Sequence, residues 1–115
     1  MHSHAPASPW ITRFAGLLPP GGQVLDLACG SGRHAAYLHG LGHRISAVDR
    51  DAAAIAALQA RLPGRFICAD IENGPWPFAG ERFDAVVVTN YLWRPLLPQV
   101  LAAVAPGGWL LYETF

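Results

Sequence analysis

Small and acidic residues gather where the first strongly apolar segment of this 115-residue chain ends, at residues 26–32 (DLACGSG). The small residues Ala28, Gly30 and Gly32 allow the backbone to pass close to a ligand, where a larger side chain would collide with it. A helix that begins after Gly32 would point its first N–H groups at the same place. The pattern predicts a turn that holds a nucleotide-like ligand, with Asp26 as a hydrogen-bond acceptor beside it.

Two kinds of nucleotide site fit these glycines. Residues 30–35 (GSGRHA) also match the G-x-G-x-x-A fingerprint of dinucleotide-binding enzymes, with Asp49 at a suitable distance for a ribose hydroxyl. The carboxylate of Asp26 would repel a pyrophosphate, whereas it would attract the sulfonium and ammonium of S-adenosylmethionine. Its charge favours S-adenosylmethionine. An NAD(P)-dependent oxidoreductase domain stays the alternative, and Asp26 could also merely orient the loop.

Strands and helices are expected to alternate along the chain. The apolar spacing predicts strands at 24–28, 44–48, 65–69, 83–89 and 109–115, and helices at 9–18, 33–41, 52–62 and 95–105. Ser8 followed by Pro9 is typical of a helix start, and Gly42 of a helix end. Residues 70–80 hold too much Pro and Gly for a helix. Residues 106–108 (PGG) indicate a turn before the last strand.

Polar residues follow four of these strands directly. Because ligands of open parallel sheets bind beyond the carboxyl ends of the strands, we expect the residues at those ends to share one crevice. The first strand leads to Asp26, Gly30 and Gly32, and the second to Asp49. The third leads to Asp70 and Ile71, and the fourth to residues 90–94.

Five segments together resemble the class I S-adenosylmethionine-dependent methyltransferases, in particular the small bacterial tellurite-resistance-like or type 11-like group. They are residues 24–32, 47–49 (AVD), 68–71 (CADI), 83–90 and 105–108 (APGG). The resemblance covers nearly the whole chain. It implies an α/β fold of three layers, in which a Rossmann-like open parallel sheet has the strand order 3-2-1-4-5 and helices cover both faces.

The resemblance also implies S-adenosyl-L-methionine as the cofactor and assigns roles around it. Asp49 would accept hydrogen bonds from both ribose hydroxyls, Asp70 would accept one from the adenine amino group, and the Ile71 backbone would meet the adenine edge. Asp70 could instead only form a turn with its own backbone. The full set implied at the cofactor is Asp26, Ala28, Gly30, Gly32, Asp49, Arg50, Asp70, Ile71 and Asn90, with Trp76 a weaker candidate.

Two positions depart from the family's pattern. Ala28 stands where many methyltransferases have a glycine, although its single methyl should still permit close approach. Residues 90–93 (NYLW) differ from the Asn-Pro-Pro-Tyr signature of amino-group methylation, so that specificity loses support. Tyr91 and Trp93 could line the methyl-transfer channel with cation–π contacts, or simply pack within their loop.

No catalytic residue is assigned. Methyl transfer is an in-line displacement at an activated carbon, so the protein contributes mainly position. Where an acceptor needs a base, His34, Tyr91 and Glu113 are the titratable groups expected nearby.

Composition limits the partners. The formal net charge is zero, and the eight basic residues are all Arg, without a run or stripe that would indicate nucleic-acid binding. A small-molecule acceptor is therefore favoured. The sequence shows neither a signal peptide nor a membrane span, which predicts a cytoplasmic protein. Cys29 and Cys68 are expected as small core residues, and the spacing of Cys and His, including His2 and His4, predicts no metal site.

We expect a helix and linker over residues 1–22 and the cofactor-binding unit over 23–115, together forming a single domain. Complete class I methyltransferases continue past the fifth strand, so the C-terminal part of that fold is expected to be missing. The strand at 109–115 would then be an exposed apolar edge that favours self-association. A catalytically silent nucleotide-binding module is a third function open to such a chain.

Overall fold

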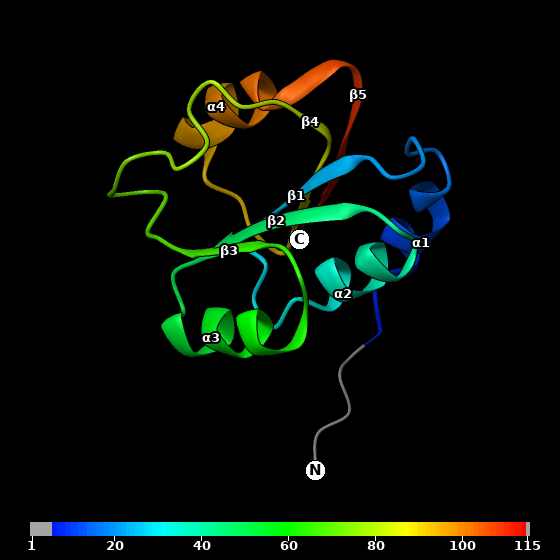
Figure 1. The fold of residues 1–115 in the computed structure, drawn as a ribbon. Coiled ribbons are helices and arrows are strands. Elements are labelled where there is room, and N and C mark those ends of the chain that lie inside the picture. Colours follow the sequence, from blue (N-terminus) through cyan, green and yellow to red (C-terminus); the bar gives the residue numbers. More distant parts are fainter. Residues whose placement is uncertain (1–5, 115) are drawn as a thin grey trace.

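The computed structural model describes residues 6–114, so His2, His4 and the expected strand end at residue 115 lie outside the described residues. Its parallel sheet has the order β3-β2-β1-β4-β5, which confirms the expected topology (Figure 1). In chain order the elements are α1 (Pro9–Ala15), β1 (Gln23–Leu27), α2 (Arg33–Gly40), β2 (Arg44–Asp49), α3 (Ala52–Arg61), β3 (Arg65–Cys68), β4 (Phe83–Thr89), the 3-10 helix η1 (Arg94–Leu96), α4 (Leu97–Ala102) and β5 (Val104–Glu113).

The first three helices begin in different ways. Ser8 caps α1 by accepting the Trp10 N–H, with Pro9 at the first helical position. Asp51 caps α3 by accepting two backbone N–H groups. In contrast, α2 begins at Gly32 without a side-chain cap. Gly32 therefore offers no side-chain acceptor to the first N–H groups of α2, which lie beside the glycine-rich turn.

Helices cover both faces of the sheet and enclose two apolar cores. Figure 1 shows α2 and α3 on one side of the sheet and α4 on the other. Ile11, Leu38 and Leu58 bring α1, α2 and α3 into the first core. The second core holds Val100 of α4 and Phe78, which is 1% exposed and fills space under the loop between β3 and β4.

The two cysteines differ. Cys29 is buried in the first core, as expected, whereas Cys68 is exposed, so its prediction as a core residue was wrong. The reason is its position at the end of β3, which pairs only with β2 and lies at the edge of the sheet.

The last helix and strand depart from expectation. The helix expected over 95–105 is split into η1 and α4 and ends at Ala102. Strand β5 begins at Val104, because the Phe83 N–H already donates to the Ala103 carbonyl at 2.7 Å. Phe83 pairs with Val104 and Ala85 with Trp109, so β5 bulges between them. The turn expected at 106–108 is this bulge, with Gly107 at φ +76°.

Over residues 6–114, no helix is both long enough and apolar enough to cross a membrane.

Candidate functional site

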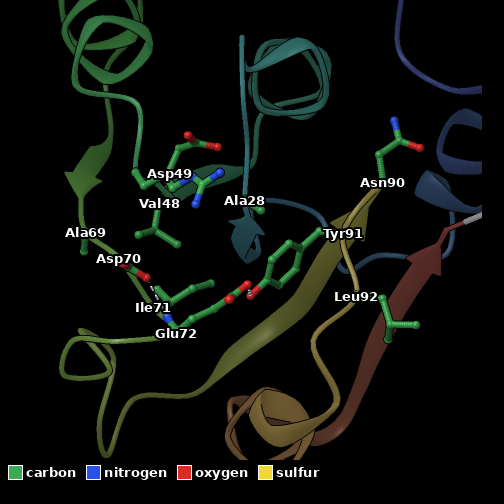
Figure 2. A pocket seen from close by; sticks show the side chains of 11 residues that line it. Ala28, Val48, Asp49, Ala69, Asp70, Ile71, Glu72, Asn90, Tyr91 and Leu92 are labelled. Atoms are coloured by element: carbon green, nitrogen blue, oxygen red, sulfur yellow. Dashed lines mark hydrogen bonds between the residues drawn. The ribbon is translucent and has the colours of Figure 1, made fainter.

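A crevice of about 450 Å³ opens at the carboxyl ends of β1 to β4 (Figure 2). It brings together most of the residues expected at the cofactor: Ala28, Asp49, Arg50, Asp70, Ile71 and Asn90. Its lining also includes Tyr91 and Leu92, which belong to the segment 90–94 expected at the site, and Val48, Ala69 and Glu72, which were not predicted as site residues. Each missed residue is a chain neighbour of a predicted one. A wider window at every strand end would have found them.

The carboxylate of Asp49 is held in the crevice by two backbone N–H groups. Its Oδ2 accepts the Gly30 N–H at 2.9 Å and its Oδ1 accepts the Asp51 N–H at 2.8 Å. A carboxylate offers about four lone-pair sites, so each oxygen keeps capacity for one further donor. Asp49 is thus fixed in orientation and still able to accept two hydroxyl groups.

Gly30 and Gly32 do not line the crevice, although both adopt left-handed backbone angles. A Cβ on Gly30, at φ +55°, would meet nothing within 4 Å. A Cβ on Gly32, at φ +80°, would lie 2.9 Å from one methyl of Leu58 and closer still to the other. Gly32 therefore permits the close packing of the turn on α3, whereas Gly30 gives its N–H to Asp49 and leaves the space above it open.

Ala28 lies in the crevice with φ +55°, a conformation that glycine adopts more readily. The position where the family has glycine therefore carries the left-handed backbone in this chain too. The strain of a non-glycine residue in this region is of the order of 1 to 2 kcal/mol, which the surrounding sheet must offset.

Asp26 does not lie in the crevice, contrary to the expectation of an acceptor beside the ligand. It is 1% exposed, and within residues 6–114 neither carboxylate oxygen has a partner in hydrogen-bond geometry. Burial raises the pKa of Asp26 to about 7, and Asp49 adds to this rise. The Ala35 backbone N–H and the charge of Arg33 lower the pKa and offset part of this rise. Asp26 sits beneath the turn because its strand position faces the first turn of α2.

Asp70 forms the turn that the sequence left as an alternative. Its Oδ1 accepts the N–H groups of Glu72 and Asn73, and its Oδ2 accepts the Asn73 side-chain amide at 3.2 Å. These hydrogen bonds, that of the Asn73 side chain first, lower the pKa of Asp70. The carboxyl group is exposed, and Oδ2 retains capacity for another donor. Asp70 thus shapes the loop that presents Ile71 to the crevice.

A hydrogen bond joins two walls of the crevice. The Tyr91 hydroxyl donates to Glu72 Oε2 at 2.9 Å, and Figure 2 shows the Tyr91 ring pointing toward Glu72 and Ile71. Burial, followed by Glu72, raises the pKa of Tyr91. The Tyr112 hydroxyl in turn donates to the Tyr91 carbonyl at 3.0 Å. Tyr91 therefore lines the site, whereas Trp93 and the weaker candidate Trp76 pack against the second core.

The comparisons with known proteins agree on one family. Residues 24–108 match the family described as a methyltransferase domain. The chain belongs to this family. An uncharacterized methyltransferase of Mycobacterium tuberculosis (strain ATCC 25618 / H37Rv) is 39% identical over 108 residues, covering 86% of this chain and 54% of the relative. Phthiotriol/phenolphthiotriol dimycocerosates methyltransferase 1 of Mycobacterium ulcerans is 36% identical over 102 residues, covering 80% and 37%.

A solved structure shows the same fold for this methyltransferase domain. A TehB-like SAM-dependent methyltransferase from Corynebacterium glutamicum superposes with a TM-score of 0.72 and 25% identity, covering 86% of this chain and 58% of the other. The chain spans about half the length of the M. tuberculosis relative and about a third of that of M. ulcerans. The family membership supports the methyltransferase interpretation over the dinucleotide-dependent oxidoreductase.

Proposed function

We propose that the crevice binds S-adenosyl-L-methionine and that the domain serves methyl transfer to a small-molecule acceptor. The observation that carries this proposal is the position of Asp49, which the glycine-rich turn holds at the end of β2 with two acceptor positions still open. Two vicinal ribose hydroxyls match two such positions on one carboxylate. The family of the chain supports the same cofactor.

The adenine end of the cofactor would lie toward β3. In this proposal the adenine ring packs on the apolar side chains of Ile71 and Leu92, which both line the crevice. Asp70 Oδ2 would accept a hydrogen bond from the adenine amino group, and the Ile71 backbone would face the ring edge. Arg50 and Asn90 complete the walls on the sides of β2 and β4.

The methionine end would lie over the glycine-rich turn. Gly30 leaves open space there, and the uncapped N-terminus of α2 presents N–H groups suited to a carboxylate. Asp26 acts from beneath this turn: when ionised, its charge favours the cationic sulfonium and ammonium without direct contact. Bound S-adenosylmethionine supplies the methyl group on an activated sulfonium, and the residues of this chain hold and orient it.

We infer a small-molecule acceptor because the chain has zero formal net charge and its arginines form no run. The proposal assigns no catalytic base. We further propose a cytoplasmic location, and self-association through β5, which pairs with β4 on one side only.

Thermal unfolding in the presence of ligands tests the proposed function. A ligand that binds only the folded state must raise its stability. S-adenosylhomocysteine should raise the unfolding temperature of the 115-residue chain, whereas NAD should leave it unchanged. Stabilisation by NAD alone would support the oxidoreductase alternative, and stabilisation by neither ligand would contradict the proposed function.

A further inference from the structure

His34 is a buried histidine with a partner on each ring nitrogen. It is 2% exposed and is the second residue of α2. Its Nε2 accepts the backbone N–H of Ser8 at 3.1 Å, and its Nδ1 lies 3.3 Å from Thr89 Oγ1. One imidazole therefore links α2, the end of β4 and the residue that caps α1.

The Ser8 contact fixes the tautomer of His34. Because a backbone N–H can only donate, Nε2 must be the unprotonated nitrogen, and the ring proton sits on Nδ1. Nδ1–H then donates to Thr89 Oγ1. Burial lowers the pKa of His34, Arg33 lowers it further, and Glu113 raises it. The neutral ring matches both contacts.

A short N-terminal segment, residues 6–8, closes over this histidine. The Arg33 guanidinium donates to the Pro6 carbonyl at 3.1 Å, and Ser8 Oγ–H donates to Glu113 Oε1 at 2.5 Å. The Glu113 carbonyl accepts the Asn90 N–H at 2.8 Å. The segment is thus bonded to the start of α2 and to the end of β5. The end of β5 is in turn bonded to Asn90, which follows β4.

These contacts border the crevice although none of their side chains lines it. Arg33 and His34 follow Gly32 directly, and Thr89 directly precedes Asn90 of the crevice wall. The His34 ring therefore connects the start of α2, next to the glycine-rich turn, with the end of β4. Both are surfaces that the proposed cofactor would touch.

We propose that His34 is a positioning residue, which holds the glycine-rich turn and the end of β4 in the arrangement that binds the cofactor, with Ser8 and Glu113 fixing the ring from outside. The effect on the turn stands on the contacts alone, whereas the effect on cofactor binding rests on the proposed function. His34 needs no contact with the cofactor for this role.

Two pairs of substitutions test the role in the 115-residue chain. His34→Leu keeps the side-chain size and removes both polar contacts, whereas His34→Gln offers an amide acceptor near the position of Nε2. Glu113→Ala removes the partner of Ser8 Oγ, and Glu113→Gln keeps an acceptor there. Thr12→Ala is the matched control, because the Thr12 hydroxyl bonds only within α1, to the Pro9 carbonyl.

Amide hydrogen exchange is measured first, without ligand, over residues 28–36 and 87–92, with α4, which packs in the second core, as the internal reference. His34→Leu should speed exchange in both segments about tenfold and Glu113→Ala about threefold, as expected for the loss of two hydrogen bonds and of one. Exchange in α4 should stay unchanged. The Gln variants should restore most of the protection, and Thr12→Ala should behave like the wild type.

The affinity for S-adenosylhomocysteine is measured on the same proteins by calorimetry. His34→Leu should raise its Kd about tenfold, with His34→Gln close to the wild type. Unchanged exchange in both segments, an equal rise in α4, or altered exchange with an unchanged Kd would each overturn the positioning role. If the wild type binds no S-adenosylhomocysteine, the proposed function fails, while the exchange data still decide whether His34 orders the turn. If His34→Leu does not fold, the Glu113 pair decides.

Discussion

Asp49 and Gly30, nineteen residues apart, are joined by a hydrogen bond of 2.9 Å from the Gly30 N–H to Asp49 Oδ2. The carboxylate at the end of β2 is therefore held by the turn that follows β1. Rotation of the side chain would leave the Gly30 N–H without its partner, so the acceptor positions of Asp49 are set before any ligand arrives. Such preorganisation lowers the entropic cost of binding.

Replacement of Asp49 should weaken cofactor binding strongly. Asp49→Ala removes the acceptor for both ribose hydroxyls and frees the Gly30 N–H, so the binding free energy of S-adenosylhomocysteine should fall by about 2 to 4 kcal/mol. Asp49→Asn, which keeps one acceptor oxygen without the charge, should give a smaller loss. Calorimetry measures both, with circular dichroism as the check on folding. An unchanged Kd in a folded Asp49→Ala protein would remove Asp49 from the site.

The buried carboxyl group of Asp26 should make stability depend on pH. The pKa of Asp26 is raised in the folded protein from 3.8 to about 7, so the folded state holds the proton more tightly than the unfolded state. The stability that the protonated Asp26 contributes is fully present below pH 3.8, and it is lost as the pH rises through 7. The corresponding free energy is about 4 kcal/mol, as an order of magnitude.

Asp26→Asn removes this titration. The free energy of unfolding of the variant minus that of the wild type should increase by a few kcal/mol between pH 4 and pH 8. The reason is that only the wild type must bury a charge at high pH. Urea unfolding at several pH values measures the difference. A difference that stays constant over this range would show that Asp26 does not titrate there.

The two glycines of the turn should respond differently to alanine. Gly32→Ala forces a Cβ against Leu58 at φ +80°, so the free energy of unfolding should fall by about 2 to 4 kcal/mol. Gly30→Ala meets no neighbour and should cost only about 1 kcal/mol of stability, but its methyl would occupy the space proposed for the cofactor. Urea unfolding and calorimetry on both variants separate the effects. Equal losses of stability would contradict the packing role of Gly32.

The outer edge of β5 should promote self-association. This ten-residue strand pairs with β4 on one side, and Trp109 is 40% exposed. Its remaining N–H and C=O groups can pair with a second copy of the chain. Light scattering over a wide concentration range should therefore show a mass that rises with concentration. A monomer at all concentrations would mean that the edge is protected.

The sequence predicted the sheet and the position of the site because both depend on local patterns. Apolar runs ending in Asp49, Asp70 and Asn90 mark the strand ends, and parallel topology brings these ends together. The start of β5 was missed because the hydrogen bond of Phe83 to Ala103 depends on pairing between distant segments. Gly107 and Gly108 led to the prediction of a turn, because a bulge favours glycine as a turn does.

The contacts within the site were less accessible to sequence reasoning. That Asp26 is buried beneath the turn, and not in the crevice, follows from the packing of α2 on β1, which no spacing encodes. The Tyr91 to Glu72 hydrogen bond joins two irregular loops. The double contact of His34 requires residues 8 and 89 to meet at one ring. Such pairs depend on tertiary structure and carry no local signal.

Binding of S-adenosylmethionine in the crevice at the ends of β1 to β4 underlies every role proposed for its residues. A titration of the nitrogen-15-labelled 115-residue chain with S-adenosylhomocysteine, followed by the amide signals in NMR spectra, measures this binding residue by residue. We expect saturable shifts at Gly30, Ile71 and Asn90, with α4 unaffected, and no shifts with NAD. Shifts with NAD but not with S-adenosylhomocysteine, or S-adenosylhomocysteine shifts confined to a face away from the crevice, would contradict this binding.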